Sequence, residues 1–140
     1  MSIQQSDVLY TAVATAENGR DGRVATDDGK LDVVVNPPRE MGGSGAGTNP
    51  EQLFAAGFSA CFQGALGVVA RQEQADVSGS TVTAEVGIGK NDGGFGIIVK
   101  ISAVIPNVDA ATARELVEKA HRVCPYSKAT RGNITVELAV

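Results

Sequence analysis

The sequence predicts an α+β fold in which antiparallel sheets pack around one long helix. Strand patterns and helix patterns come in runs along the chain, which argues against a parallel sheet with alternating helices. One stretch, about residues 51–72, is apolar nearly all round, and a helix of that kind is buried in a large core or a membrane. The length of 140 residues fits a single domain, residues 1–140, without a linker to a second one.

The first 35 residues have the pattern of three strands. Residues 8–16 alternate apolar and polar side chains, and apolar runs at 23–27 and 31–35 follow turn-rich segments. These features predict a three-stranded antiparallel meander. The segment 36–50, which is rich in proline and glycine, predicts a loop.

The long helix is expected to begin at the end of that loop. Thr48 or Asn49 can cap it, and Pro50 is tolerated in a first helical turn. Glu51 follows Thr48 with the spacing of a capping box. Residues 53–70 reach the lower length limit of a membrane span, but they include three glycines, Ser59 and Gln63, so we expect a core helix.

Small residues recur on this helix at helical spacing. They would let another backbone approach closely, either within one chain or across a helix pair in a dimer. Spacing alone leaves both explanations open for Gly57, Ala60, Cys61, Gly64 and Gly67.

The second half of the chain begins with a hairpin pattern. Residues 80–89 alternate apolar and polar side chains, and the apolar segment 97–105 completes a hairpin after the turn at 90–96. Residues 110–123 then have an apolar side at helical spacing, and Asp109 is a suitable N-cap.

Pro125 ends that helix, because proline cannot continue the backbone hydrogen bonds. Residues 134–140 are expected to form the last strand. The predicted order is therefore three strands, a long helix, two strands, a short helix and one strand.

Charge and composition exclude several classes of partner. The net charge is −4 and the 12 Lys and Arg residues are scattered, so no basic stripe is available for nucleic acid. The N-terminal residues have neither a basic nor an apolar export segment, so we expect a cytoplasmic protein without a membrane partner. Disulfides in that compartment are mostly transient, and they act in catalysis or in sensing.

The chain has 2 cysteines, Cys61 in the middle of the long helix and Cys124 after the short one. They form neither a CxxC motif nor a zinc-binding spacing, and the single histidine, His121, does not complete one. A buried cysteine ordinarily acts as a small apolar residue, so packing is the alternative to reactivity. Any partnership between the two thiols must come from the fold.

A reactive Cys61 would need help from a cation. A free thiol has a pKa of about 8.5, and apolar burial lowers its thiolate fraction further. The helix dipole has faded about three turns from the N-terminus, where Cys61 is expected. An arginine held by a carboxylate could stabilise both the thiolate and the charge that develops on a departing oxygen. Spacing does not choose among the arginines.

Three segments together resemble one family. They are "GRDGR" at 19–23, "TNPEQLFAAGFSACF" at 48–62 and "VCPYSKATRGNI" at 123–134, and they stand in the same order as in the organic hydroperoxide resistance family of the OsmC-like superfamily. The resemblance covers nearly the whole chain. It implies an OsmC-like fold, an intertwined homodimer with its sites at the subunit interface, and a cysteine-based peroxidase for organic hydroperoxides.

The resemblance also implies a role for four residues. Matched motif by motif, Cys61 is the peroxidatic cysteine and Cys124 the resolving one, with a disulfide between them. Arg20 activates the thiolate and the peroxide, and Glu51 orients Arg20. Dihydrolipoyl groups, free or on lipoylated proteins, are the implied reductant. No bound cofactor, metal, haem or flavin is expected.

Other functions remain open alternatives. An OsmC-type peroxidase is the nearest, followed by a non-catalytic thiol redox sensor and a non-redox module for hydrophobic ligands. Arg23 and Asp21 are interpreted as turn and surface residues, and His121 as a solvated residue near a helix C-terminus. The aromatic side chains Phe54, Phe58 and Phe95 could line an apolar pocket, but we expect them to serve mainly in core packing.

Overall fold

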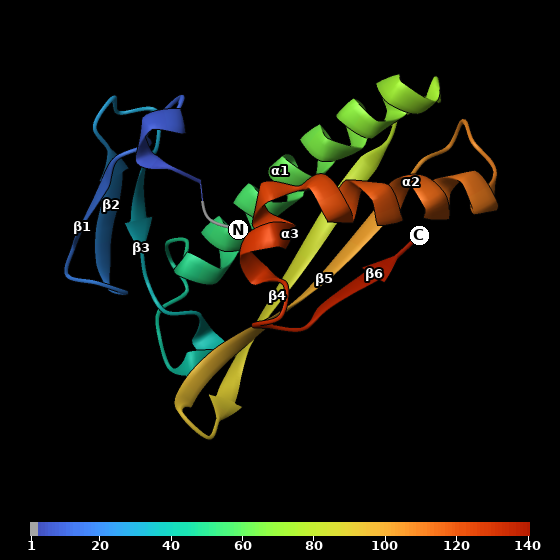
Figure 1. The fold of residues 1–140 in the computed structure, drawn as a ribbon. Coiled ribbons are helices and arrows are strands. Elements are labelled where there is room, and N and C mark those ends of the chain that lie inside the picture. The colour runs from blue at the N-terminus through green and yellow to red at the C-terminus, as the bar shows by residue number, and fades with distance from the viewer. Residues whose placement is uncertain (1–2) are drawn as a thin grey trace. The chain divides into compact units, whose positions relative to one another are not determined.

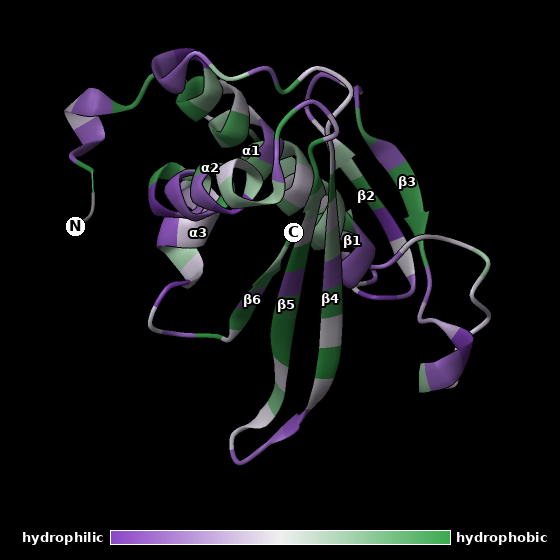
Figure 2. Cartoon of the chain, turned by 90° about the vertical axis from the view of Figure 1, so that its right-hand side faces the viewer, coloured by the Kyte–Doolittle hydropathy of each residue, from purple (hydrophilic) through white to green (hydrophobic). Residues whose placement is uncertain are grey.

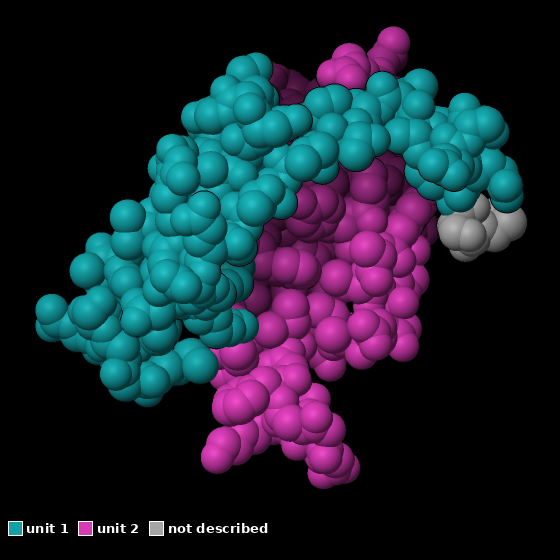
Figure 3. Space-filling view, turned by 90° about the vertical axis from the view of Figure 1, so that its left-hand side faces the viewer, with its two compact units in different colours: residues 1–50 teal, residues 51–140 magenta. Residues whose placement is uncertain are grey.

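The computed structural model describes residues 3–140, and Met1 and Ser2 lie outside the described part. The chain forms two compact units, residues 1–50 and residues 51–140, which are coloured separately in Figure 3. Each unit has its own three-stranded sheet. The assignment of residues 1–140 to a single domain stays a prediction.

The first unit contains the predicted meander. Strands β1 (Ala14–Glu17), β2 (Gly22–Thr26) and β3 (Asp32–Val35) pair antiparallel in the order β1-β2-β3. Short 3-10 helices, η1 (Gln5–Asp7) and η2 (Arg39–Met41), stand before and after the sheet. The meander is confirmed, and the predicted loop at 36–50 contains one turn of helix.

The first strand is shorter than its sequence pattern predicts. Residues 8–13 lie outside β1 and are exposed, with Leu9 fully exposed to solvent. Alternation predicts a strand because one of its faces is buried. Residues 8–13 bury neither face, so the prediction was wrong for this part of the segment.

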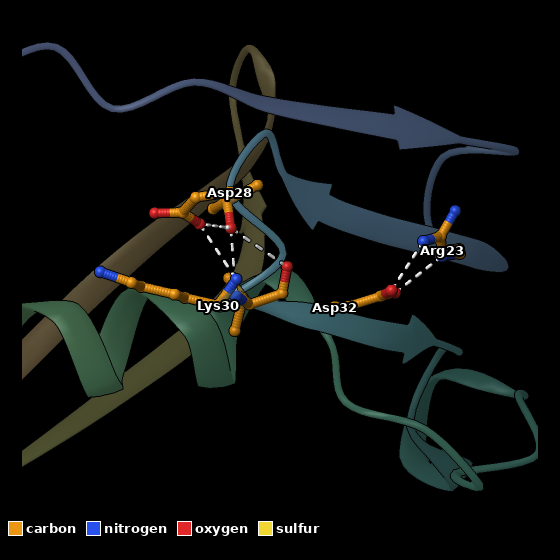
Figure 4. A network of polar contacts seen from close by, with 6 residues as sticks. Arg23, Asp28, Lys30 and Asp32 are labelled. Atoms are coloured by element: carbon orange, nitrogen blue, oxygen red, sulfur yellow. Dashed lines mark hydrogen bonds and ion pairs between the residues drawn. The ribbon is translucent and has the colours of Figure 1, made fainter.

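A bidentate ion pair joins β2 to β3 on the surface of the first unit. Arg23 donates from both Nε and Nη2 to the carboxylate of Asp32, at 2.7 Å each, and Figure 4 shows this pair. Hydrogen bonding to Asp32 raises the pKa of Arg23, and the same bonds lower the pKa of Asp32. At the nearby turn, Asp28 accepts hydrogen bonds from Thr26 Oγ1 and the Lys30 backbone. Arg23 is thus a surface residue, as predicted, but it lies in strand β2 and not in the turn.

The second unit places two helices over one face of a sheet (Figure 1). Its elements are α1 (Pro50–Glu73, of which Pro50 itself falls in the first unit), β4 (Thr81–Asn91), β5 (Gly94–Val104), α2 (Ala110–Val123), α3 (Pro125–Thr130) and β6 (Val136–Ala139). Helix α1 begins at Pro50 and α2 at Ala110, as predicted. Asp109 caps α2 by accepting a hydrogen bond of 2.7 Å from the Thr112 backbone N–H.

The hairpin β4-β5 is longer than the alternation predicts, because its turn is only two residues, Asp92 and Gly93. Hydropathy changes from residue to residue along β4, as Figure 2 shows. Strand β6 joins β5 in parallel, which corrects the expectation of purely antiparallel sheets. A parallel pair needs a crossover connection, and α2 and α3 supply it between β5 and β6.

The core of the second unit lies between the helices and the inner face of the sheet. It is built from α1, β5 and α2, with the fully buried side chains Phe58, Phe62, Leu66, Ile101 and Val117 among its members. By length and composition alone α1 could cross a membrane, and core helices pass the same test. Its buried residues follow one face, which is why α1 belongs to this core.

We predict that Leu116→Ala lowers the free energy of unfolding by about 2–5 kcal/mol, because the substitution leaves a cavity where α2 meets the core. Leu116 is only 2% exposed. Val123→Ala, at a half-exposed position of the same helix, is the control and should change stability by no more than about 0.5 kcal/mol. Urea unfolding followed by circular dichroism measures both, and equal losses would contradict the core assignment.

Candidate active site

The two thiols of the chain lie side by side in the second unit. Cys124 Sγ donates a hydrogen bond to Cys61 Sγ across 3.6 Å, although 63 positions separate the two residues in the sequence. Both are free cysteines, Cys61 partly buried and Cys124 completely buried. A disulfide bond of about 2.05 Å would need the sulfurs to approach by roughly 1.5 Å, which a small side-chain movement can supply.

Cys124 reaches this position because the chain changes direction there. Proline disfavours a helical conformation in the residue before it, and Cys124 is extended, with φ −62° and ψ 124°. Its N–H still bonds to Ala120 O at the end of α2, and its carbonyl accepts from the Lys128 N–H in α3. Cys124 is therefore the pivot between the two helices. The end of α2 predicted at Pro125 is confirmed, but α3 was not predicted, although proline is favoured at a first helical position.

Aromatic packing holds α3 against α1. The Tyr126 ring lies 5.6 Å from the Phe58 ring and 6.1 Å from the Phe54 ring, centroid to centroid. A Cβ at Gly57 would stand 2.9 Å from Tyr126 Oη, so only glycine lets this ring lie so close to α1. The missing Cβ at Gly57 thus allows close packing within one chain, while at Gly64 an added Cβ meets no atom within 4 Å.

The environment of Cys61 makes its thiol a weaker acid. Burial raises the pKa of the Cys61 thiol, a hydrogen bond from the Tyr126 backbone N–H lowers it, and contact with Cys124 raises it again. The net direction is upward, as expected for a thiol among apolar groups. Activation of Cys61 at neutral pH therefore requires a positive charge beyond these residues.

Arg20 and Glu51 lie in different units of the chain. Arg20 belongs to the turn between β1 and β2, which Asn18 and Gly19 form with positive φ angles. Glu51 lies in the first turn of α1, and ten residues of helix put it about 15 Å along the axis from Cys61. Of the four predicted site residues, the structure brings Cys61 and Cys124 together. The roles of all four residues stay predictions.

A largely apolar cavity of about 450 Å³ adjoins helices α1 and α3. Phe54, two turns from Cys61 on the same face of α1, and Tyr126 contribute to its wall, and the other lining residues are Ile97, Ala129, Thr130, Asn133 and Ile134. Phe58 is fully buried, which confirms its predicted role in core packing. Phe95 is 64% exposed on β5, so for this residue the prediction of core packing was wrong.

His121 is partly buried rather than solvated, which corrects the interpretation from sequence. Its Nδ1 lies 2.9 Å from Oγ of the fully buried Ser127, and its carbonyl accepts a hydrogen bond from Arg131. Burial lowers the pKa of His121, and the charge of Arg131 lowers it further. Across residues 3–140, no three His, Cys, Asp or Glu side chains cluster in a way that could hold a metal ion.

Sequence reasoning missed the residues that position the thiols. Tyr126 and Ser127 lie inside the quoted segment "VCPYS", but nothing in that pattern shows that one packs on Gly57 or that the other bonds to His121. The available signal was Pro125, which marks a helix start and hence free N–H groups beside Cys124.

Comparison with known proteins identifies the family. Residues 42–139 match the model of the OsmC-like protein family. The chain is 53% identical to an organic hydroperoxide resistance protein of Xanthomonas axonopodis pv. citri, over 95% of both chains. The chain belongs to the organic hydroperoxide resistance family of OsmC-like proteins.

Solved structures agree with this assignment. The crystal structure of an organic hydroperoxide resistance protein from Elizabethkingia anophelis has a TM-score of 0.90 at 51% identity, covering 96% of this chain and 97% of that one. For OhrB of Bacillus subtilis the TM-score is 0.87 at 46% identity, covering 94% and 98%. The α+β fold predicted from the sequence is the fold of this family.

We predict that Gly57→Ala slows formation of the Cys61–Cys124 disulfide several-fold under a mild oxidant such as diamide. The added methyl displaces the Tyr126 ring and with it the start of α3. Alanine also favours the helix by up to about 1 kcal/mol, so stability should change little. Gly64→Ala makes the same change where space is open, and it should leave the rate unaltered. Timed alkylation and mass spectrometry measure the rate, and equal rates in both variants would contradict the packing argument.

Proposed function

We propose that the protein is a thiol-dependent peroxidase that reduces organic hydroperoxides to alcohols. Membership of the family, and relatives named for organic hydroperoxide resistance, support a role in organic peroxide detoxification. The observation that carries the proposed thiol chemistry is the 3.6 Å contact between two free thiols in a chain of this family. Two such thiols can hold the oxidising equivalents of one peroxide as a disulfide.

In the first step, the thiolate of Cys61 attacks one oxygen of the hydroperoxide. The O–O bond breaks, a new S–O bond forms, and the alcohol leaves after taking up a proton. Cys61 is oxidised to a sulfenic acid, and the peroxide is reduced by two electrons. Because burial raises the pKa of Cys61, this step is slow unless a cation stabilises both the thiolate and the departing oxygen.

Arg20 is the cation that we assign to this step. The assignment rests on its place in the "GRDG" segment, residues 19–22, which is a family motif. A guanidinium offers a planar fork that can hold the sulfur and the peroxide oxygens at once. Glu51, in the segment "NPEQ", is assigned to orient that fork, because a mobile arginine would stabilise the transition state poorly.

In the second step, Cys124 resolves the intermediate. Its sulfur attacks Cys61 Sγ, the S–O bond of the sulfenic acid breaks, and water leaves with the proton of the Cys124 thiol. The product is an intrachain disulfide. The complete burial of Cys124 keeps this sulfur away from competing oxidants until Cys61 has reacted.

Dihydrolipoyl groups are the proposed reductant, either free or carried on lipoylated proteins. Two thiols of one dihydrolipoyl group can open the disulfide by two successive exchanges and close into their own ring disulfide. We place the protein in the cytoplasm as a homodimer, without bound cofactor or metal. These assignments follow from the family resemblance.

We assign the cavity near α1 and α3, whose lining residues include neither Cys61 nor Cys124, to the apolar substituent of the peroxide. Its wall is mostly apolar, with Phe54, Ile97 and Ile134 among the lining side chains. Each methylene group that a substrate buries there contributes about 0.8 kcal/mol. Fatty or aromatic hydroperoxides should therefore be preferred over hydrogen peroxide.

We predict multiple turnovers of tert-butyl hydroperoxide when dihydrolipoamide is the reductant, and much slower turnover with thioredoxin. A coupled steady-state assay measures both, and Cys61→Ser, which removes the nucleophile, should abolish the reaction. A redox sensor would give one equivalent of disulfide and then stop. A hydrophobic ligand-binding module would not consume peroxide, and either outcome would overturn the proposal.

Replacing Arg20 with lysine should lower kcat/KM for the hydroperoxide by about 100-fold, the loss typical of removing a transition-state hydrogen-bond donor. Lysine keeps the positive charge but loses the fork. Arg23→Lys, at the surface pair with Asp32, is the matched control and should retain activity. Unchanged kinetics in Arg20→Lys would remove Arg20 from the site.

A further inference from the structure

The mechanism leaves one buried polar contact unused. His121 and Ser127 face each other at 2.9 Å, between the last turn of α2 and the first turn of α3. Ser127 is a completely buried polar residue in the interior of the second unit. Burying a hydroxyl costs free energy unless it is hydrogen-bonded, so the partner supplied by His121 fixes where this part of α3 can lie.

The same histidine ties α3 to α2 a second time. Arg131, the residue that follows α3, donates from Nη2 to the His121 carbonyl at 2.6 Å. The start and the end of the six-residue helix α3 are thus both attached to one residue of α2. Between these attachments, Cys124 is the extended pivot about which α3 would otherwise turn.

The orientation of α3 determines how close the two sulfurs lie. Cys124 directly precedes α3, and its Sγ lies 3.6 Å from Cys61 Sγ. A change in the backbone angles of Cys124 would turn α3 and would also displace this sulfur. Disulfide formation requires the two sulfurs to close roughly 1.5 Å, so it is sensitive to this rotation.

We propose that His121 is a positioning residue for the resolving step, and that its hydrogen bond to Ser127 holds Cys124 in reach of oxidised Cys61. This inference rests on the proposed peroxidase function. The step that it affects is attack of the Cys124 sulfur on the Cys61 sulfenic acid, with loss of water. Formation of the sulfenic acid from the organic hydroperoxide does not involve His121.

The test follows the two steps separately after mixing the reduced protein with one equivalent of tert-butyl hydroperoxide. Rapid quenching, dimedone labelling and mass spectrometry quantify the sulfenic acid and the disulfide. His121→Ala should form sulfenic acid at a rate within about two-fold of the wild type, but disulfide about ten times more slowly. With excess peroxide, this variant should accumulate sulfinic acid on Cys61, because the unresolved intermediate reacts again.

Further variants separate positioning from stability. His121→Asn places an amide where Nδ1 stands and should restore most of the disulfide rate, whereas Arg122→Ala, at the exposed neighbour, should not change it. Ser127→Ala should match His121→Ala, and the double variant should be no slower than either single one, because all three lack the same hydrogen bond.

Two results would overturn this inference. One is an unchanged disulfide rate in His121→Ala, even if its unfolding free energy falls, and the other is fully additive losses in the double variant. Failure of the proposed function gives a different result. In a hydrophobic ligand-binding module, the wild type itself would form neither sulfenic acid nor disulfide, and in a redox sensor it would form both once but would not turn over with dihydrolipoamide.

Discussion

The contact between Cys61 Sγ and Cys124 Sγ is the interaction on which the proposed chemistry depends. Two thiols separated by 63 positions come within 3.6 Å because a six-residue helix, α3, is packed against the middle of α1. That packing has three parts: the turn that Pro125 imposes on Cys124, the space that Gly57 leaves for Tyr126, and the attachment of α3 to α2 at His121. Each part acts on geometry rather than on acidity.

The acidity of the Cys61 thiol sets a second constraint, which opposes the close packing of the two sulfurs. The apolar surroundings that bring the sulfurs together also raise the pKa of Cys61, and one backbone N–H offsets only part of this effect. A thiolate in such a place needs a cation, and a thiolate stabilised too strongly loses nucleophilicity as its pKa falls. The proposed arginine resolves this conflict, because its hydrogen bonds can strengthen when charge moves from sulfur to the departing oxygen.

Local signals in the sequence were sufficient for most of the elements. Helix α1 starts at the proline that predicts it, and Asp109 caps α2 as its spacing indicates. Features that depend on contacts between distant residues were harder to predict from the sequence. The parallel pairing of β6 depends on where a crossover returns the chain, and residues 8–13 alternate without burying either face. For the site, motifs selected both cysteines. The supporting contacts of Gly57 and His121 join residues on different helices, which no local pattern records.

In the proposed cycle, one organic hydroperoxide converts the two thiols into an intrachain disulfide. The most direct measurement uses equal amounts of ¹⁵N-labelled and unlabelled protein, mixed in denaturant, refolded together and treated with one equivalent of tert-butyl hydroperoxide. Peptide mass spectrometry under non-reducing conditions then identifies the linked peptides. We predict a Cys61–Cys124 link whose two peptides always carry the same isotope. Linked peptides of mixed isotope, or none joining these two cysteines, would rule out the intrachain disulfide.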